Sequence, residues 1–269
     1  MSPTPPQFEH SSMPRRTLAV FTVLTAIMLI TLVAASCSPH TARTSAPTSD
    51  VVRAGSSDLA TAHIVDNVDN QRVMSRAATG DTTAKERGRV TIEQHISTAN
   101  GAANVMLYKL GHYASGTFYD TMSMTREGLR PISERMQFGS TVKVIDYDGD
   151  RVHETVQVGD STPRVLDRRF PVTVFGFNQL ELVVRSLRLR PGFHAILPLY
   201  SEGDDSLEMD TATVVQLAQA NDGSASPTWT VRFADPAIVG TYVIDTLSRR
   251  ITSYEVRARK SGMQTWIER

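Results

Sequence analysis

The sequence predicts a mainly β domain: a single antiparallel curved sheet, as a half-barrel or open barrel, with one packed helix. Three observations predict this fold. From Arg89 onward, short segments alternate between apolar and polar residues. Turn-forming residues separate these segments at short intervals. One segment, Phe177–Leu187, instead repeats its apolar residues at helical spacing.

The expected strands follow one another with short connections, which favours antiparallel neighbours. Asn100-Gly101 and Asp148-Gly149 are hairpin dipeptides, and the second predicts a type I′ turn. The expected strands are Val90–Ile96, Asn104–Leu110, Thr117–Met124, Ile132–Phe138, Thr141–Tyr147, Asp150–Val158, Phe193–Tyr200, Thr211–Leu217, Thr228–Phe233, Thr241–Ile244, Ile251–Arg259 and Met263–Ile267.

The expected helix has a start signal and a stop signal. Asn178 is the predicted N-cap, and Pro191-Gly192 ends the segment. Packed against a curved sheet, the helix would present an apolar face that could border a ligand groove. The candidate groove residues are Phe177, Leu180, Val184 and Leu187. Plain core packing is the alternative for these residues.

The first forty residues have the three parts of a secretory signal. Arg15-Arg16 is basic, Leu18–Ala35 is almost entirely apolar, and small residues lead to Cys37. Positive charge before the apolar run predicts that the chain after it is translocated. Met13 is the better start, because residues 2–12 would form an unusual leader without positive charge.

Residues 13–37 resemble the signal of a bacterial lipoprotein. Ala35, Ser36 and Cys37 match the family's lipobox, while Ala34 stands where Leu is usual. The resemblance implies cleavage between Ser36 and Cys37 and a lipid on the Cys37 thiol. The alternatives are an uncleaved signal anchor, since the apolar run is long enough to span a bilayer, and simple secretion.

The predicted organisation has three parts. Residues 1–36 form the signal peptide, residues 37–88 a lipidated cysteine with a flexible linker, and residues 89–269 the β domain. A Ser/Thr/Pro/Ala-rich tract, Ser38–Asp50, supports the linker, although Ser57–Met74 could form a short helix.

Charge and cysteine content argue against nucleic-acid binding and exclude disulfides within the chain. The signal contains Arg15, Arg16 and Glu9, so its removal leaves 26 basic against 27 acidic residues, without the basic excess of a nucleic-acid-binding protein. Cys37 is the only cysteine, so no disulfide within the chain can stabilise the domain.

Motifs for catalysis and metal binding are absent from the sequence. It has no His-Glu-x-x-His, no Gly-x-Ser-x-Gly, no P-loop and no dinucleotide fingerprint. Asp146, Asp148 and Asp150 lack the Gly and Glu that complete a calcium loop, and His153-Glu154 is expected to point to opposite faces of a strand. We therefore expect no catalytic residues, metal or cofactor.

Two groups of motifs resemble exported bacterial β-proteins of the DUF3108 type. One comprises Phe118-Tyr119-Asp120-Thr121, Leu129-Arg130-Pro131 and Asp146-Tyr147-Asp148-Gly149, and the other is Leu180–Leu187 followed by Leu189-Arg190-Pro191-Gly192. The resemblance spans about residues 89–268 and departs from the family at Tyr242, where a Trp is usual. It implies a half-barrel similar to periplasmic lipoprotein carriers and supplies no catalytic residues.

These observations predict a non-enzymatic lipoprotein, exported and anchored on the extracytoplasmic side of a membrane. Its expected ligand is a lipid or acyl chain held in a groove of the sheet. The alternative is a structural or interaction module that binds another protein of the cell envelope, and a hydrolase is the third possibility. A filled core with an open strand edge would favour the interaction module.

Overall fold

The computed structural model describes residues 50–269 except 100, 203–206, 221–226 and 235–237. Within these residues, sixteen strands form one sheet that is mainly antiparallel and not closed. The strands are β1 (Asp50–Val51), β2 (Asn67–Arg76), β3 (Lys85–Ala99), β4 (Ala102–Tyr113), β5 (Gly116–Thr125), β6 (Pro131–Phe138), β7 (Thr141–Asp148), β8 (Arg151–Val158), β9 (Arg164–Arg169), β10 (Phe175–Gly176), β11 (His194–Glu202), β12 (Leu207–Ala220), β13 (Thr228–Ala234), β14 (Ile238–Asp245), β15 (Ile251–Ala258) and β16 (Gln264–Glu268).

The strand order joins two runs of consecutive antiparallel strands, β11–β16 and β2–β9. The order is β1-β11-β12-β13-β14-β15-β16-β2-β3-β4-β5-β6-β7-β8-β9, and β10 also pairs with β11. The two runs meet where β16 pairs with β2, with Trp266 opposite Met74. The short strands β1 and β10 both pair with β11 in parallel, so they are exceptions to the antiparallel pattern.

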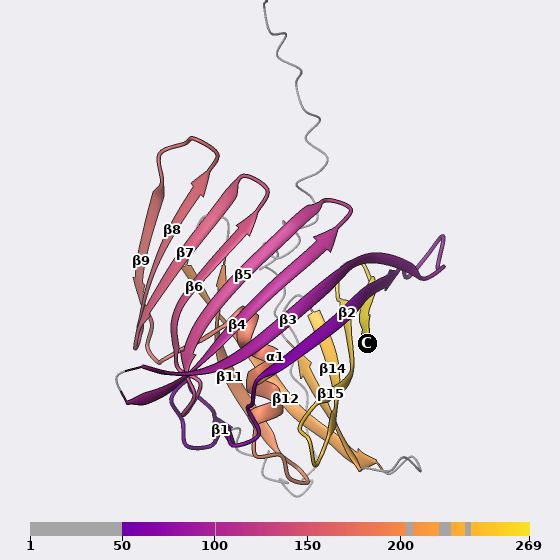
Figure 1. The fold of residues 1–269 in the computed structure, drawn as a ribbon. Coiled ribbons are helices and arrows are strands. Elements are labelled where there is room, and N and C mark those ends of the chain that lie inside the picture. The colour runs from indigo at the N-terminus through magenta and orange to yellow at the C-terminus, as the bar shows by residue number, and fades with distance from the viewer. Residues whose placement is uncertain (1–49, 100, 203–206, 221–226, 235–237) are drawn as a thin grey trace, which may run out of the picture. The chain divides into compact units, whose positions relative to one another are not determined.

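The sheet curves so that strands far apart in this order face each other. The Tyr200 hydroxyl of β11 donates a hydrogen bond to Glu154 of β8. The Tyr200 and Tyr147 rings meet edge to face with their centroids 6.0 Å apart. This curvature confirms the predicted half-barrel type of fold, and Figure 1 shows β2–β9 as a fan of long strands.

One short helical segment lies inside the curve. A 3₁₀ turn, η3 (Phe177–Gln179), leads directly into α1 (Leu180–Ser186), which confirms the predicted helix. The predicted N-cap at Asn178 is wrong, because Gln179 holds that position of α1 and Gly176 that of η3. Lys109 of β4 donates to the Asn178 carbonyl, and Arg249 of the β14–β15 turn donates to the Leu187 carbonyl.

The two predicted hairpin turns form. Ala99 of β3 pairs with Ala102 of β4, as the predicted hairpin requires, and Asn100 lies outside the described residues. Between β7 and β8, Asp148 pairs with Arg151, so the central residues are Gly149 and Asp150. Of these two, Gly149 alone has a positive φ, 62°, which fits a type II′ turn and corrects the predicted type I′ turn.

The domain begins earlier than the sequence predicts. The linker expected up to residue 88 and the helix expected over Ser57–Met74 are wrong for much of this stretch, because β2 occupies residues 67–76. Residues 50–66, which we call the strap, cross one end of the core. The strap is held by the pairing of β1 with β11 and by the bond from the Ala60 amide to the Ser186 carbonyl at 2.7 Å. Its Val52, Leu59 and Ile64 are buried.

Candidate functional site

Of the residues predicted to form functional sites, those of the signal lie outside the described residues and those of the groove lie within them. Ser36 and Cys37 lie outside the described residues, so signal cleavage and lipidation stay predictions. In the part of the chain that the structure describes, no helix is long and apolar enough to cross a bilayer.

The candidate groove residues lie mostly in the core. Leu180, Val184 and Leu187 are 5%, 0% and 0% exposed and belong to one continuous hydrophobic cluster with residues of both runs of strands. Phe177 is 40% exposed and lies outside that cluster. A ligand groove at this helix stays a prediction, and the close packing of these three residues weighs against it.

A group of buried polar residues faces the helical segment from the inner side of β5–β8. Asp120, Glu134 and Glu154 are 2%, 1% and 0% exposed. Strand alternation explains their burial, because each is two residues from a buried apolar residue of its own strand, for example Met122 for Asp120. We call these three acids the carboxyl cluster.

Asp120 and Glu134 form a close pair. Burial raises the pKa of Asp120, and the neighbouring Glu134 carboxylate raises it further, to about 7. Burial also raises the pKa of Glu134, while hydrogen bonds from Asn178 and Tyr147 act in the opposite direction. Among the described residues no donor reaches either carboxylate oxygen of Asp120. The protonated Asp120 carboxyl is therefore favoured below about pH 7.

Glu134 connects the sheet to the helical segment. Its Oε1 accepts a 2.6 Å hydrogen bond from Asn178 Nδ2, and its Oε2 accepts a 3.0 Å bond from the Tyr147 hydroxyl. Gly176 lies directly against this arrangement, since a Cβ there would stand 2.9 Å from the Tyr147 hydroxyl oxygen. The carboxyl cluster therefore fixes the approach of β10 and η3 to the sheet.

Glu154 connects β8 to the distant strand β11. It accepts the hydrogen bond from Tyr200, and the Lys143 ammonium lies 3.9 Å from its Oε1. His153, the next residue along β8, points to the other face, where its Nδ1 lies 3.8 Å from Asp167. This arrangement confirms the expected divergence of His153 and Glu154. No group of three metal-ligating side chains occurs among the described residues.

The outer face of the sheet carries a shallow depression of about 360 Å³. Tyr108 and Tyr119 border it and are 41% and 51% exposed. Lys109 and Asp120 lie on its floor, and their side chains belong to the inner face by strand alternation. The depression therefore lies on the opposite face of the sheet from the carboxyl cluster.

The strand β9 ends the sheet. In the described residues it pairs with β8 alone, and Leu166 is its single residue that is not exposed. Its sequence, Arg-Val-Leu-Asp-Arg-Arg, places Val165 on the outer face at 56% exposure. Arg169 on the same face donates to Asp150 at 2.8 Å. β12 comes close to β9 without pairing with it, so among the described residues the second edge of β9 has no strand partner.

Sequence reasoning missed the carboxyl cluster, although a signal for it was present. Asp120, Glu134 and Glu154 each occupy the apolar phase of an alternating strand, and a charged residue in that phase indicates a buried polar group. Their convergence depends on the curvature of the sheet and on Tyr200 of a distant strand, which no local pattern reveals.

No protein-family model matches the chain, and no curated protein matches it. The DUF3108 resemblance therefore stays a prediction. Among solved structures, the chain is similar to one described as a β-barrel-like protein of the domain of unknown function DUF1849 from Brucella abortus. The two share 9% sequence identity with a TM-score of 0.48, over 76% of this chain and 95% of that one.

Proposed function

We propose that the chain is a non-enzymatic binding module of the cell envelope, tethered to a membrane by a lipid on Cys37. The module binds an extended segment of another envelope protein along the edge of β9. The observation that carries this proposal is that β9 is a six-residue strand paired on one side only among the described residues. An extended peptide can add to such an edge through main-chain hydrogen bonds.

The filled interior argues for binding at the edge rather than inside the sheet. An acyl chain needs an apolar cavity, and the core residues Val183, Val184 and Leu187 are fully buried by protein. The described residues form a depression of about 360 Å³ on the outer face and one of about 340 Å³ along the strap, and both lie at the surface. Lipid binding inside the sheet is therefore the weaker alternative.

The burial of the carboxyl cluster argues against catalysis. A pair of carboxyls with raised pKa can serve as general acid and base only where a substrate reaches it. Asp120 and Glu134 are at most 2% exposed, and Gly176 packs directly over Glu134. The hydrogen bonds that Glu134 accepts come from Asn178 and Tyr147 of the protein itself, as in a structural polar network.

The charges of β9 are matched at least in part within the domain. Asp167 pairs with Arg151, and Arg169 pairs with Asp150. The proposal therefore depends on the main chain of β9, and we expect the bound segment to be extended and held by main-chain hydrogen bonds.

Site-specific photocrosslinking in cells tests the proposal. A benzoylphenylalanine at Val165 should give a covalent adduct with a distinct envelope protein. Val68 is the matched control, because it is also on the outer face and is 55% exposed but lies on β2. Equal adducts at both positions, no adduct at Val165, or an adduct with a second copy of this chain would contradict the proposal.

A further inference from the structure

Three arginine side chains and a histidine surround the C-terminal end of α1. We call His63, Arg126, Arg185 and Arg249 the cationic cluster. Arg126 brackets His63, because its Nη2 donates to the carbonyls of Ala62 at 3.3 Å and Ile64 at 2.9 Å.

The strap and the β14–β15 turn bring these side chains together. The Ala60 amide bonds to the Ser186 carbonyl, so His63 lies close to the last turn of α1. Arg249 Nη1 donates to the Leu187 carbonyl at 3.2 Å. The turn that carries Arg249 is well defined, because Asp245 Oδ1 accepts hydrogen bonds from the amides of Leu247 and Ser248.

Positive charge in this cluster is only partly balanced by nearby acids. Burial lowers the pKa of His63 to about 4, and Arg185, Arg249 and Arg126 contribute to this shift through their positive charges. Burial also lowers the pKa of Arg185; Glu181 and Asp69 act in the opposite direction, and Arg269 and Arg250 in the same direction as burial.

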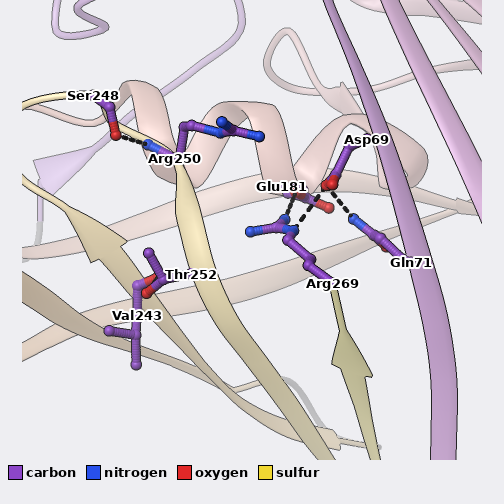
Figure 2. A network of polar contacts seen from close by, with 8 residues as sticks. All are labelled: Asp69, Gln71, Glu181, Val243, Ser248, Arg250, Thr252 and Arg269. Carbon is purple, nitrogen blue, oxygen red and sulfur yellow. Dashed lines mark hydrogen bonds and ion pairs between the residues drawn. The ribbon is translucent and has the colours of Figure 1, made fainter.

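The acids within reach of Arg185 already have another partner. Arg269 donates to Asp69 at 2.8 Å and to Glu181 at 3.2 Å. Figure 2 shows these three side chains together, and it also shows Arg250, the residue directly before β15. Asp69 and Glu181 therefore pair with Arg269, and their negative charge neutralises Arg185 only in part.

Three polar atoms at this end of the helix have no hydrogen-bond partner among the described residues. They are Arg185 Nε, His63 Nε2 and the Ser186 hydroxyl oxygen, and all three are buried. Ser186 as a whole is 0% exposed, and a buried donor without a partner costs about 1–3 kcal/mol. His63 and Arg185 themselves are only partly buried, so the cluster borders solvent.

We infer that the cationic cluster is a binding site for a phosphate group, with Arg185 and His63 as its main donors and Ser186 as a third. A phosphate oxygen is the acceptor that these groups lack, and a planar guanidinium matches phosphate geometry. The negative charge of the phosphate would also offset the repulsion among the cations.

Two sources could supply this phosphate group: free phosphate, or the phosphodiester of a lipid headgroup. The second source rests on the proposed membrane tether. The strap follows Cys37 by about a dozen residues, which span at most about 40 Å when extended and could hold this end of the domain near a membrane surface. Binding of free phosphate does not depend on the tether or on the β9 edge.

Calorimetric titration of the full chain in a neutral detergent tests the inference. Inorganic phosphate should bind and raise the melting temperature above that in chloride of equal ionic strength. Arg185→Gln and His63→Gln should each weaken phosphate binding about tenfold or more, as the loss of a charge-assisted hydrogen bond does. Arg188→Gln removes the same charge from an exposed neighbour and should bind like the wild type.

Mixed micelles separate the two sources. A greater rise in melting temperature with phosphatidylglycerol than with diacylglycerol, abolished by Arg185→Gln, would assign the site to a lipid headgroup. Phosphate binding without this lipid effect would assign it to free phosphate, whether or not Cys37 is lipidated. The inference would be overturned if the wild-type chain did not bind phosphate, or if Arg185→Gln bound it equally well. The first of these results does not depend on whether a variant folds.

Discussion

Arg269 donates a 2.8 Å hydrogen bond from its Nε to Oδ2 of Asp69, a residue 200 positions earlier in the chain. This pair lies where β16 meets β2, the junction between the two runs of hairpins. Its second contact, to Glu181, extends the network to α1 (Figure 2). One side chain therefore ties both runs of strands to the helix inside the sheet.

Arg269→Ala is expected to destabilise the domain by about 1–3 kcal/mol, because it leaves the partly buried carboxylates of Asp69 and Glu181 without the cation that pairs with both. Chemical denaturation monitored by circular dichroism measures the change. Lys260→Ala, at an exposed position of the β15–β16 turn, is the control and should cost less than about 0.5 kcal/mol. An equal effect of the two substitutions would show that the network contributes little.

Val184→Ala distinguishes a filled core from a ligand cavity. Val184 is 0% exposed, so its truncation is expected to cost about 1–3 kcal/mol, as the loss of packed methyl groups does. Val165→Ala, at a residue 56% exposed, is the matched control and should change the free energy of unfolding by less than about 0.5 kcal/mol. A small effect at Val184, together with a melting temperature raised by fatty acid, would restore the lipid-groove interpretation.

Stability should depend on pH through Asp120. The folded state keeps a proton on this carboxyl up to about pH 7, whereas the unfolded chain releases it near pH 4. The wild type should therefore lose stability as pH rises through this window, by about 2–4 kcal/mol, and Glu134 acts in the same direction. Asp120→Asn stays neutral, so its stability relative to the wild type should increase from pH 4 to 7 and then level off.

His63 gives stability the opposite dependence on pH. Its pKa is lowered to about 4, so stability from this residue is present above pH 6.5 and is lost as pH falls towards 4. Because both proteins contain His63, its contribution cancels in the difference between Asp120→Asn and the wild type. Asp160→Asn, at an exposed residue, should reproduce the wild-type profile. A constant difference across the window would refute the assignment to Asp120.

Membrane attachment should require Cys37. Each buried methylene of a lipid adds about 0.8 kcal/mol, so two or more acyl chains hold a protein at a bilayer almost permanently. Cys37→Ser should leave an unprocessed or mislocalised precursor, detected by membrane fractionation and mass spectrometry, whereas Ser38→Ala should behave like the wild type. Normal processing and membrane association of Cys37→Ser would exclude the lipoprotein signal.

The sequence predicted the hairpins and the helix well because these depend on local chemistry. The alternation of β4–β8 and the helical spacing of Leu180, Val184 and Leu187 each reflect one buried face. The strand β2 escaped prediction because its buried positions include polar residues, Gln71 and Ser75, which hide the alternation. The exposed edge strand β9 carries too few apolar residues to show a period.

The candidate sites were less predictable than the strands. The carboxyl cluster and the cationic cluster each combine residues from strands or turns that are far apart in the sequence. His63 approaches Arg185 only because the strap crosses the end of α1, and Glu154 reaches Tyr200 only because the sheet curls. Such contacts depend on the tertiary arrangement, which periodicity and motif spacing do not encode.

The parallel pairing of β1 and β10 with β11 has a consequence for self-association. These strands occupy the β11 edge at Ala195–Ile196 and at Leu199–Tyr200, so the chain caps this end of its own sheet. Head-to-tail polymerisation of a sheet needs two free edges per molecule, and the described residues leave one long edge, β9. Any edge-to-edge association of copies would therefore stop at a closed pair, which protects the protein from growing into fibres.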